Sequence, residues 1–340
     1  MSGEDFGSLL KRVASGETLD AAESARAFGA IMAGEVSEIR IAALATALAV
    51  RGPTVDELFG AVRAMRGAMQ SIEANPYAID LCGTGGDGID TVNISTACAF
   101  VVAACGVPVA KHGGRSATSK SGTADCLEAL GVNIALSPAG ASRCLREVGL
   151  CFLFAQAYHP AMKYAAPVRR ELGFRTIFNL IGPLSNPARV RRQLVGVYAK
   201  EWCVPLAEVL GRLGAECAWV VHGDGLDDIA TSGPSHVAIL EDGKVTTREI
   251  GPEDAGLSWS PISALAGGTA TENAAALRRL FDSDGGAYRD IVLINSAAAL
   301  VVAGKAADLR EGVALAVSAI DSGAAKAKLE KLIEVSKAAA

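Results

Sequence analysis

The sequence predicts an α/β protein that consists of a small all-helical domain and a larger α/β domain with a mainly parallel central sheet flanked by helices. Two observations predict this fold class. Residues 1–72 carry apolar residues at helical spacing and show no strand pattern, whereas short strand-like and helix-like segments alternate after Asn75-Pro76. A chain of 340 residues can also bury a sizeable core and form two domains.

The first 72 residues are predicted to form capped helices. The side-chain oxygen of Asp, Ser or Thr can accept a hydrogen bond from a free N–H group at a helix start. The predicted cap and helix pairs are Asp20 with 21–33, Ser37 with 39–50, and Thr54 with 55–69. Asn75-Pro76 then breaks the helical pattern and predicts a linker.

The remainder predicts a sheet with helices on both faces, because strands and helices alternate at short spacing. The strand-like segments are 78–82, 107–111, 150–155, 193–198 and 218–221. The helix-like segments are 95–104, 122–130, 138–148 behind a Ser137 cap, and 159–172. Segments 237–240 and 245–250 flank a hairpin turn at 241–244, and most of the chain from 271 onward is predicted as helix, including a terminal helix at 326–340.

Composition excludes several classes of partner and place. A net charge of −5 gives no general attraction for nucleic acid or an anionic membrane, so we expect neither as a partner. The eight cysteines contain no Cys-x-x-Cys pair, which predicts reduced core thiols and a cytoplasmic location. The longest apolar run, 97–110, is too short for a membrane span, and the acidic N-terminus lacks a signal-peptide core.

Three polar turns lie between Gly83 and Ser121. The turn 83–88 follows a strand-like segment, 93–96 opens a helix-like segment, and 111–121 follows another strand-like segment. Loops with glycine, hydroxyl groups and cations after strands are typical of phosphate sites in α/β proteins. The sequence therefore predicts chemistry on a multiply phosphorylated small molecule.

Each turn also has a plainer interpretation. The turn 83–88 matches neither a Walker A loop nor a Rossmann fingerprint, and taken alone it is a simple turn. Residues 93–96 are sufficient for a helix cap, although a hydroxyl there can also reach a metal ion. The segment 111–121 is either a solvated basic loop or a cover over a pyrophosphate, and its cations are Lys111, Arg115 and Lys120.

Acidic and basic groups elsewhere suggest two further roles. The run 222–228 holds Asp224, Asp227 and Asp228 after a strand, which suits Mg²⁺ but also suits an aspartate-rich turn. Arg169 and Arg170 could clamp a carboxylate or could simply mark an exposed helix end, and the residues alone leave both open.

Taken together, these segments resemble the anthranilate phosphoribosyltransferase family. The matching segments are collinear and cover most of the chain: 80–88, 93–96, 111–113, 121–125, 154–160, 173–179, 182–184 and the acidic loop from 221. The resemblance implies a helical domain and an α/β domain with the substrates between them. We assign 1–72 and about 160–187 to the helical domain, and 73–159 and about 188–340 to the α/β domain.

The resemblance also implies a reaction. Phosphoribosyl pyrophosphate (PRPP) would transfer its phosphoribosyl group to the amino group of anthranilate, a step of tryptophan biosynthesis, and release pyrophosphate. The family uses Mg²⁺, for which we expect two ions, and is usually a homodimer through the helical domain.

The resemblance assigns site residues position by position. The PRPP positions are Gly83, Gly86, Asp87, Thr91, Asn93, Ile94, Ser95, Thr96, Lys111, His112, Gly113, Gly114, Arg115, Ser116, Ala117, Thr118, Ser119 and Thr123. The anthranilate positions are Gly83, Gly114 and Arg169, and the metal positions are Ser95, Asp227 and Asp228. No residue is assigned as an acid or a base.

Three positions depart from the family's pattern. Thr123 stands where serine is usual and keeps the hydroxyl, Gly114 replaces an asparagine at the acceptor site, and Asp228 replaces a glutamate. We expect PRPP binding to persist while acceptor affinity or choice changes. The rival functions are transfer to another aminobenzoate, a pyrimidine-nucleoside phosphorylase of similar architecture, and a non-catalytic nucleic-acid-binding relative.

Overall fold

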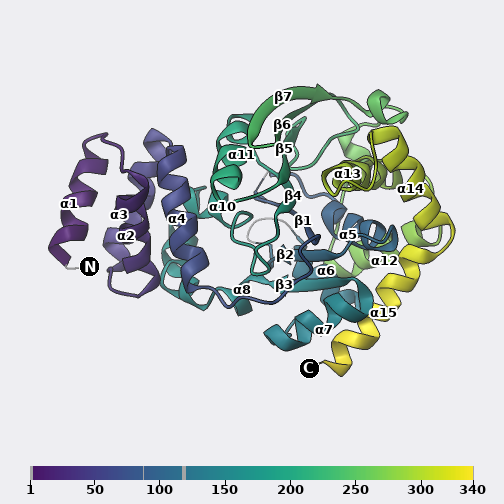
Figure 1. Ribbon diagram of the computed structural model, residues 1–340, viewed down its shortest axis with the longest axis horizontal. Helices are drawn as coiled ribbons and strands as arrows, with labels where there is room; N and C mark the ends of the chain where they lie inside the picture. Colours follow the sequence, from purple (N-terminus) through teal and green to yellow (C-terminus); the bar gives the residue numbers. More distant parts are fainter. Residues whose placement is uncertain (1–2, 87, 117–119, 340) are drawn as a thin grey trace.

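A helical bundle lies beside a larger body of sheet and helices in the computed structural model, which describes residues 3–86, 88–116 and 120–339 (Figure 1). The bundle contains α1 (Gly3–Ala14), α2 (Ala21–Met32), α3 (Glu38–Arg51) and α4 (Val55–Ala68). The predicted combination of a helical and an α/β part is therefore confirmed.

Two of the three helix caps predicted in the first 72 residues are confirmed, as is the cap predicted at Ser137, whose side chain accepts the Gly140 N–H group. Asp20 and Thr54 accept hydrogen bonds from the first turns of α2 and α4, each in a capping box with the glutamate three residues later. The cap chemistry predicted at Ser37 is wrong, because its side chain accepts no cap hydrogen bond from α3. Ser37 is exposed, so water can satisfy the first N–H groups of that helix instead.

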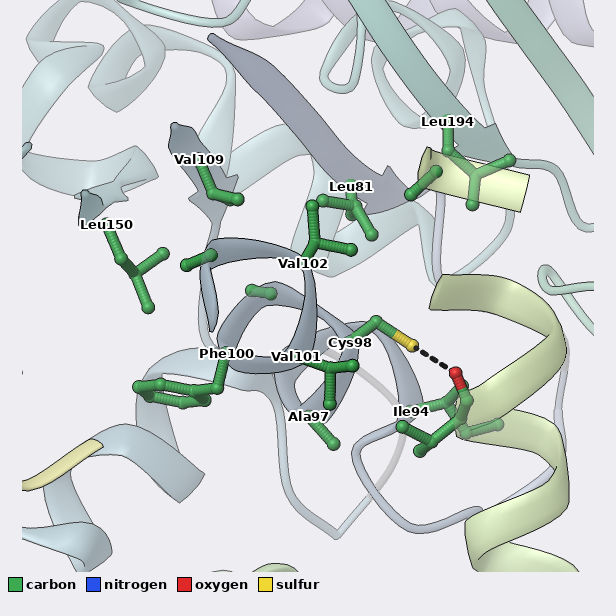
Figure 2. Packing of buried hydrophobic residues seen from close by; sticks show 14 of the residues in the cluster. Leu81, Ile94, Ala97, Cys98, Phe100, Val101, Val102, Val109, Leu150 and Leu194 are labelled. Atoms are coloured by element: carbon green, nitrogen blue, oxygen red, sulfur yellow. Dashed lines mark hydrogen bonds between the residues drawn. The ribbon is translucent and has the colours of Figure 1, made fainter. Parts of the chain in front are cut away.

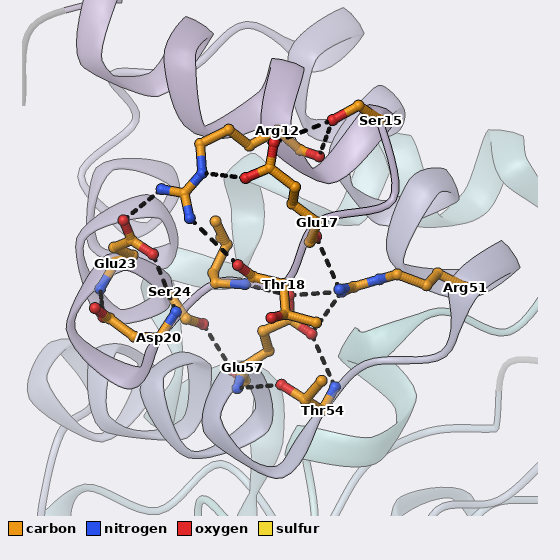
Figure 3. Close-up of polar contacts among 11 residues, drawn as sticks. Arg12, Ser15, Glu17, Thr18, Asp20, Glu23, Ser24, Arg51, Thr54 and Glu57 are labelled. Atoms are coloured by element: carbon orange, nitrogen blue, oxygen red, sulfur yellow. Dashed lines mark hydrogen bonds and ion pairs between the residues drawn. The ribbon is translucent and has the colours of Figure 1, made fainter.

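The bundle is joined by a buried carboxylate, Glu57, whose side chain is surrounded by donors (Figure 3). Its oxygens accept the N–H groups of Leu19 at 2.9 Å and Thr54 at 2.8 Å. They also pair with the Arg51 guanidinium, and Ser24 donates to the Glu57 carbonyl at 2.6 Å. A charge is tolerated in an interior only when it is paired and hydrogen-bonded in this way.

The larger part contains a seven-stranded sheet with the order β3-β2-β1-β4-β5-β6-β7. The first five strands in this order are parallel, and β6 and β7 are antiparallel additions at one edge. The strands are β1 (Ile79–Gly83), β2 (Val109–Gly113), β3 (Leu150–Phe154), β4 (Arg192–Gly196), β5 (Cys217–Gly223), β6 (Ser235–Glu241) and β7 (Lys244–Ile250). The predicted hairpin is the β6–β7 pair, and Asp242 and Gly243 at its turn both have positive φ.

Helices cover both faces of the sheet, as predicted. On one face, α5 packs on β1, β2 and β3 while α13 packs on β4 and β5; on the other, α11 packs on β5, β6 and β7. Along β5, Trp219 and Val221 join one core while Ala218 and Val220 join the other, which is the two-residue period of a strand buried on both sides. The helices of this part are α5 (Ile94–Ala104), α6 (Thr123–Leu130), α7 (Pro138–Val148), α11 (Cys203–Arg212), α12 (Ala270–Phe281), α13 (Ala287–Val302), α14 (Leu309–Asp321) and α15 (Ala324–Ala338), with short 3₁₀ turns at Lys200–Trp202, Pro252–Ala255 and Ile262–Leu265.

Helix α5 forms the centre of the first core. It is apolar on every side, and nine of its residues are buried between the sheet and the outer helices (Figure 2). Its Cys98 thiol donates to the Val292 carbonyl of α13 at 3.5 Å. Because α5 is enclosed in this way, its N-terminus is held rigidly at the edge of the sheet.

The segment 155–181 differs from its prediction as one helix over 159–172. It contains α8 (Ala155–Tyr158), a 3₁₀ turn (Pro160–Tyr164), α9 (Ala166–Leu172) and α10 (Ile177–Ile181). Pro160 and Pro167 lack an N–H group and clash with the preceding turn of a helix, so the chain breaks at both. In this segment α9 packs on α3, and α10 packs on α3 and α4.

Within the described residues, we find no helix with both the length and the apolar character needed to cross a bilayer.

Candidate active site

The predicted site residues follow the carboxyl ends of parallel strands, where α/β sheets bind ligands. Gly83 ends β1, Gly113 ends β2, and the acidic run leaves the end of β5. In the sheet, β1 lies between β2 and β4. The chain leaves β1 toward β2 and β3 on one side, and the later strands β4 and β5 lie on the other side, so the strand order reverses beside β1. The fold thus brings together segments that are more than 100 residues apart.

Asp227 lies directly against the first glycine turn. Its Oδ2 accepts the Gly85 N–H group at 2.7 Å. A Cβ atom at Gly83 would lie 2.2 Å from that same oxygen, and one at Gly196 would lie 1.5 Å from the Asp227 carbonyl oxygen. Glycine is therefore required at both positions for the aspartate to approach the sheet edge.

Ser95, Asp227 and Asp228 line one small cavity of about 10 Å³ at the end of the sheet. At its edge the Lys111 ammonium donates to the Leu81 carbonyl at 2.6 Å and to Ser95 Oγ at 3.1 Å. A hydroxyl oxygen has two lone pairs, so Ser95 Oγ can accept the hydrogen bond from Lys111 and still offer a lone pair to a cation. The cavity thus presents hard oxygen donors beside a fixed cation.

These donors fit Mg²⁺. Magnesium is usually held by one or two carboxylates together with substrate phosphate oxygens rather than by a cage of protein ligands. The described residues contain no group of three or more His, Cys, Asp or Glu side chains placed to hold a metal.

A buried carboxylate on β1 supports the turn at the end of β2. Asp80 accepts the His112 N–H group at 3.0 Å and the Asn186 side-chain amide at 2.7 Å. Burial raises the pKa of Asp80, while the nearby Lys111 ammonium and these hydrogen bonds oppose that effect. The same Asn186 amide also donates to the Ala110 carbonyl at 2.8 Å, so it ties the two strands together.

His112 and His159 form a buried pair, with their Nε2 atoms 3.2 Å apart. Burial lowers the pKa of His112 well below its ordinary value, and it lowers the pKa of His159 to about 4. Both rings are therefore neutral near pH 7. His159 Nδ1 is buried and has no hydrogen-bond partner among the described residues.

The helix-opening turn is fixed by contacts from several elements. Asn93 Oδ1 accepts the Asn273 amide at 2.9 Å, and its Nδ2 donates to the Ser121 carbonyl at 3.3 Å. The hydroxyls of Thr96 and Thr123 lie 3.3 Å apart, so the threonine that replaces the family's serine reaches the same turn.

Other predicted positions around this turn are placed as follows. Thr91 forms a β-bridge with Ala266, Ile94 begins α5 in the core, Gly86 lies in the left-handed region with φ of 73°, and Gly113 is packed near Phe152.

Arg115 is already paired with carboxylates in this structure. Its guanidinium lies 2.7 Å from Asp125 and 2.6 Å from Glu128, and it stacks on the Phe154 ring. These carboxylates raise the pKa of Arg115. The adjacent Ser116 N–H also donates to Asp125, at 3.3 Å. The predicted positions Asp87, Ala117, Thr118 and Ser119 lie outside the described residues.

Arg169 lies on α9, at some remove from the turns in sequence, and is half-buried. Burial lowers the pKa of its guanidinium. Within the described part of the chain, its side chain forms no ion pair or hydrogen bond. A Cβ atom at Gly114 would lie 3.5 Å from the Gln156 side chain and 3.7 Å from that of Ala155.

Two residues at the site were missed by the sequence reasoning. Asn186 lies at the end of the segment assigned to the helical domain, and Asn295 lies in the part of the chain predicted only as helix. The side chain of Asn295 bonds both backbone groups of Ile229, the residue after Asp228. A single amide within the apolar run 291–302 was the available signal.

Two family models match the chain. Residues 7–69 match the helical bundle domain of a glycosyl transferase family, and residues 75–326 match the a/b domain of a glycosyl transferase family. Together with the phosphate-type turns, they define the chain as a glycosyl transferase of this two-domain class.

Named relatives narrow the class. The chain is 56% identical to the anthranilate phosphoribosyltransferase of Rhodopseudomonas palustris (strain HaA2) over 336 residues, which cover 98% of this chain and 99% of that protein. It is 56% identical to the protein of the same name from Parvibaculum lavamentivorans over 330 residues, 97% of each chain.

Solved structures agree. The anthranilate phosphoribosyltransferase from Thermus thermophilus superposes with a TM-score of 0.92 at 43% identity, over 96% of this chain and 99% of that one. The enzyme from Saccharomyces cerevisiae in complex with PRPP and Mg superposes with a TM-score of 0.90 at 26% identity, over 99% of both chains. The chain therefore belongs to the anthranilate phosphoribosyltransferase family.

Proposed function

We propose that this chain transfers the phosphoribosyl group of PRPP to the amino nitrogen of anthranilate and releases pyrophosphate. The observation that carries the proposal is the convergence of Ser95, Lys111, Asp227 and Asp228 at one end of the sheet. Oxygen donors for a divalent cation and a fixed ammonium group at one edge are what a diphosphate requires. The S. cerevisiae relative, in complex with PRPP and Mg, supports this donor.

The donor site that we propose comprises the three polar turns. The N-terminus of α5 would hold phosphate oxygens, since the first turn of a helix presents unpaired N–H groups, and the 83–88 turn would add backbone N–H groups beside it. Lys111 would hold the diphosphate by charge. Arg115 would bind the diphosphate in one of two ways. Its guanidinium either leaves Asp125 and Glu128 or contacts the diphosphate while it stays paired with them.

The acceptor site that we propose centres on Arg169 and Gly114. A half-buried guanidinium without an anionic partner among the described residues is suited to the carboxylate of anthranilate, which can accept two parallel hydrogen bonds from it. A complex of the S. cerevisiae relative with 4-fluoroanthranilate supports an acceptor of this class. The glycine at 114 leaves the acceptor without a side-chain amide there, so a different aminobenzoate is the second candidate acceptor.

The proposed chemistry needs positioning rather than a strong base. An aromatic amine is already neutral near pH 7, so its lone pair can attack C1 of PRPP directly while the bond from C1 to the diphosphate oxygen breaks, and the nitrogen then releases one proton to water. Lys111 and the N–H groups of the turns stabilise the charge that develops on the departing diphosphate. Mg²⁺, for which we propose two ions held through Ser95, Asp227 and Asp228, neutralises diphosphate charge when it is bound.

We also propose a homodimer through the helical domain. Ile39 and Val50 on α3 are 82% and 84% exposed, and Ala43 lies between them on the same helical face. Apolar side chains presented along one helix are suited to a second copy of the same surface.

The domain boundaries and the location in the cell remain part of the proposal. Helix α9 packs on α3, and α10 packs on α3 and α4, which supports placing about 160–187 with the helical domain. The free state of all eight cysteines supports a cytoplasmic location.

The loss of anthranilate fluorescence on mixing with PRPP and Mg²⁺ tests the proposed function. We expect Mg²⁺-dependent loss of fluorescence, with one pyrophosphate released for each anthranilate consumed. Release of pyrophosphate only with another aminobenzoate would select the second candidate. Phosphorolysis of thymidine, or a salt-sensitive DNA complex without PRPP turnover, would reject both.

A further inference from the structure

Asn295 is a buried amide that holds the segment carrying the two aspartates. It lies on α13 and is 1% exposed. Its Oδ1 accepts the Ile229 N–H group at 2.9 Å, and its Nδ2 donates to the Ile229 carbonyl at 2.8 Å and to the Ile291 carbonyl at 2.9 Å. Every N–H of the side-chain amide is thereby used, and two of its three bonds go to the residue after Asp228.

The opposite side of this segment rests on glycines. A Cβ atom at Gly223 would lie 2.7 Å from the Asp228 carbonyl oxygen, in addition to the close approaches at Gly83 and Gly196 described above. Contact with a bare backbone limits movement toward the sheet, and on this side the Asp227 side chain accepts the Gly85 N–H group. The amide of Asn295 holds the backbone of the segment itself, at Ile229.

Ser235 on β6 is a second anchor for the same segment. Its hydroxyl is fully buried and accepts the Ala230 N–H group at 2.9 Å. Asn295 and Ser235 therefore hold consecutive residues directly after the aspartates, while Asn295 itself lines the cavity with Ser95, Asp227 and Asp228.

We propose that Asn295 is a positioning residue that sets where Asp227 and Asp228 stand opposite Ser95, and so sets the Mg²⁺ requirement for PRPP binding. This inference rests on the proposed function. Residues that orient metal ligands typically change metal affinity 10- to 100-fold when they are replaced.

The chemistry of the position explains why an amide is needed there. Ile229 is fully buried, so its N–H and carbonyl groups have no access to water. An aspartate would accept from the N–H group but would face the carbonyl with an oxygen, and a leucine would bond to neither. Buried backbone groups without partners are costly, so the segment would shift until they found new ones.

Calorimetric titration of PRPP into the full-length protein at a series of Mg²⁺ concentrations tests the proposal without turnover. The variants are Asn295→Ala and Ser235→Ala. The matched control is Ser336→Ala on α15, because Ser336 is also fully buried and its hydroxyl also accepts a backbone N–H group, that of Asn133 at 3.0 Å. Thermal unfolding of each variant reports the structural cost separately.

We expect the Mg²⁺ concentration for half-maximal PRPP affinity to rise about 10- to 100-fold in Asn295→Ala. A rise of a few-fold is expected in Ser235→Ala and none in Ser336→Ala, while PRPP affinity at saturating Mg²⁺ returns close to that of the unmodified protein. A Mg²⁺ dependence in both site variants equal to that of Ser336→Ala would overturn the proposal. If Asn295→Ala does not fold, the two serine variants decide alone, and absence of Mg²⁺-dependent PRPP binding in the unmodified protein would instead reject the proposed function.

Discussion

Arg51 in the helical bundle and Arg169 on α9 are both partly withdrawn from water, but among the described residues only the first has an anionic partner. Arg51 pairs with the buried Glu57, whose oxygens also accept two backbone N–H groups. Arg169 forms no ion pair or side-chain hydrogen bond with the residues that the structure describes, and burial lowers its pKa. Charges satisfied within the chain hold the fold together, whereas charges left without partners are available to a ligand.

The largest effect on activity is expected at Asp227, a residue that we propose contacts the bound metal. Asp227→Ala should lower kcat/KM by about 100- to 1,000-fold, because it removes a donor to the metal that neutralises diphosphate charge. Its unfolding free energy should change by less than about 1 kcal/mol, since the hydrogen bond that it accepts from the Gly85 N–H group is exposed. Fluorescence kinetics and urea denaturation measure the two quantities. Asp282→Ala, at a surface ion pair with Lys326, is the control, and normal activity of Asp227→Ala across a Mg²⁺ titration would remove the metal assignment.

Glu57, the partner of Arg51 in the helical bundle, should give the reverse result, with a large change in stability and none in activity. Glu57→Ala should lower the unfolding free energy by about 3 kcal/mol, because Arg51 and two backbone N–H groups lose a buried partner. The protein that remains folded should keep its kcat/KM. Urea denaturation is the measurement, with Glu23→Ala in the other capping box costing only about 1 kcal/mol. Equal losses of unfolding free energy in the two variants would mean that the burial of Glu57 adds nothing to what a capping glutamate contributes.

Arg169→Ala should raise the KM for anthranilate by about 10- to 100-fold, the range expected for loss of charge-assisted hydrogen bonds. Its kcat at saturating anthranilate and its KM for PRPP should stay unchanged, and its stability should not fall, because a desolvated cation is removed. Arg170→Ala, the exposed neighbour on the same helix, is the matched control for steady-state kinetics. A change in the KM for PRPP instead would move Arg169 to the donor side.

The histidine pair predicts a pH dependence of stability. In the folded state the pKa of His159 is lowered to about 4, whereas in the unfolded chain it has its ordinary value of about 6.5. Between about pH 6.5 and pH 4, the unfolded chain therefore binds more protons than the folded protein does. Stability should therefore fall by about 2 kcal/mol as the pH drops from 7.5 to 5. Denaturation midpoints at several pH values should show a shallower fall in His159→Gln and an unchanged one in His236→Gln, whose ring is exposed. A flat profile in the unmodified protein would contradict the buried neutral pair.

The smallest effect is expected at Gly114. A Cβ atom there would meet Gln156 at 3.5 Å and Ala155 at 3.7 Å, which are ordinary contacts, so Gly114→Asn should fold normally. One new hydrogen bond of about 1 kcal/mol would lower the KM for anthranilate roughly fivefold and leave PRPP unchanged. Titration with anthranilate and ring-substituted analogues measures this. An unchanged anthranilate affinity would show that the glycine does not determine the acceptor.

Features set by neighbours in the chain could be predicted from sequence. The caps at Asp20 and Thr54, the β6–β7 turn and the glycine turns all depend on a few consecutive residues. Helix α11 was not predicted, although its Pro205 lies in the first turn, where a helix tolerates proline. The break in 159–172 was missed because the two prolines there were given too little weight.

Contacts between distant segments could not be predicted. Asp80 and Asn186 are 106 residues apart, and Asn295 and Ile229 are 66 residues apart, so no local pattern joins either pair. Arg115 was counted as an available cation because no carboxylate adjoins it in sequence, but the packing of α6 brings Asp125 and Glu128 to it.

A crystal structure with PRPP and Mg²⁺ bound tests the central claim most directly. We predict that the diphosphate lies among the 83–88 turn, the N-terminus of α5 and Lys111, with metal density between it and Asp227. Diphosphate density bound elsewhere on the molecule, while these groups make no contact with it, would contradict the proposed site.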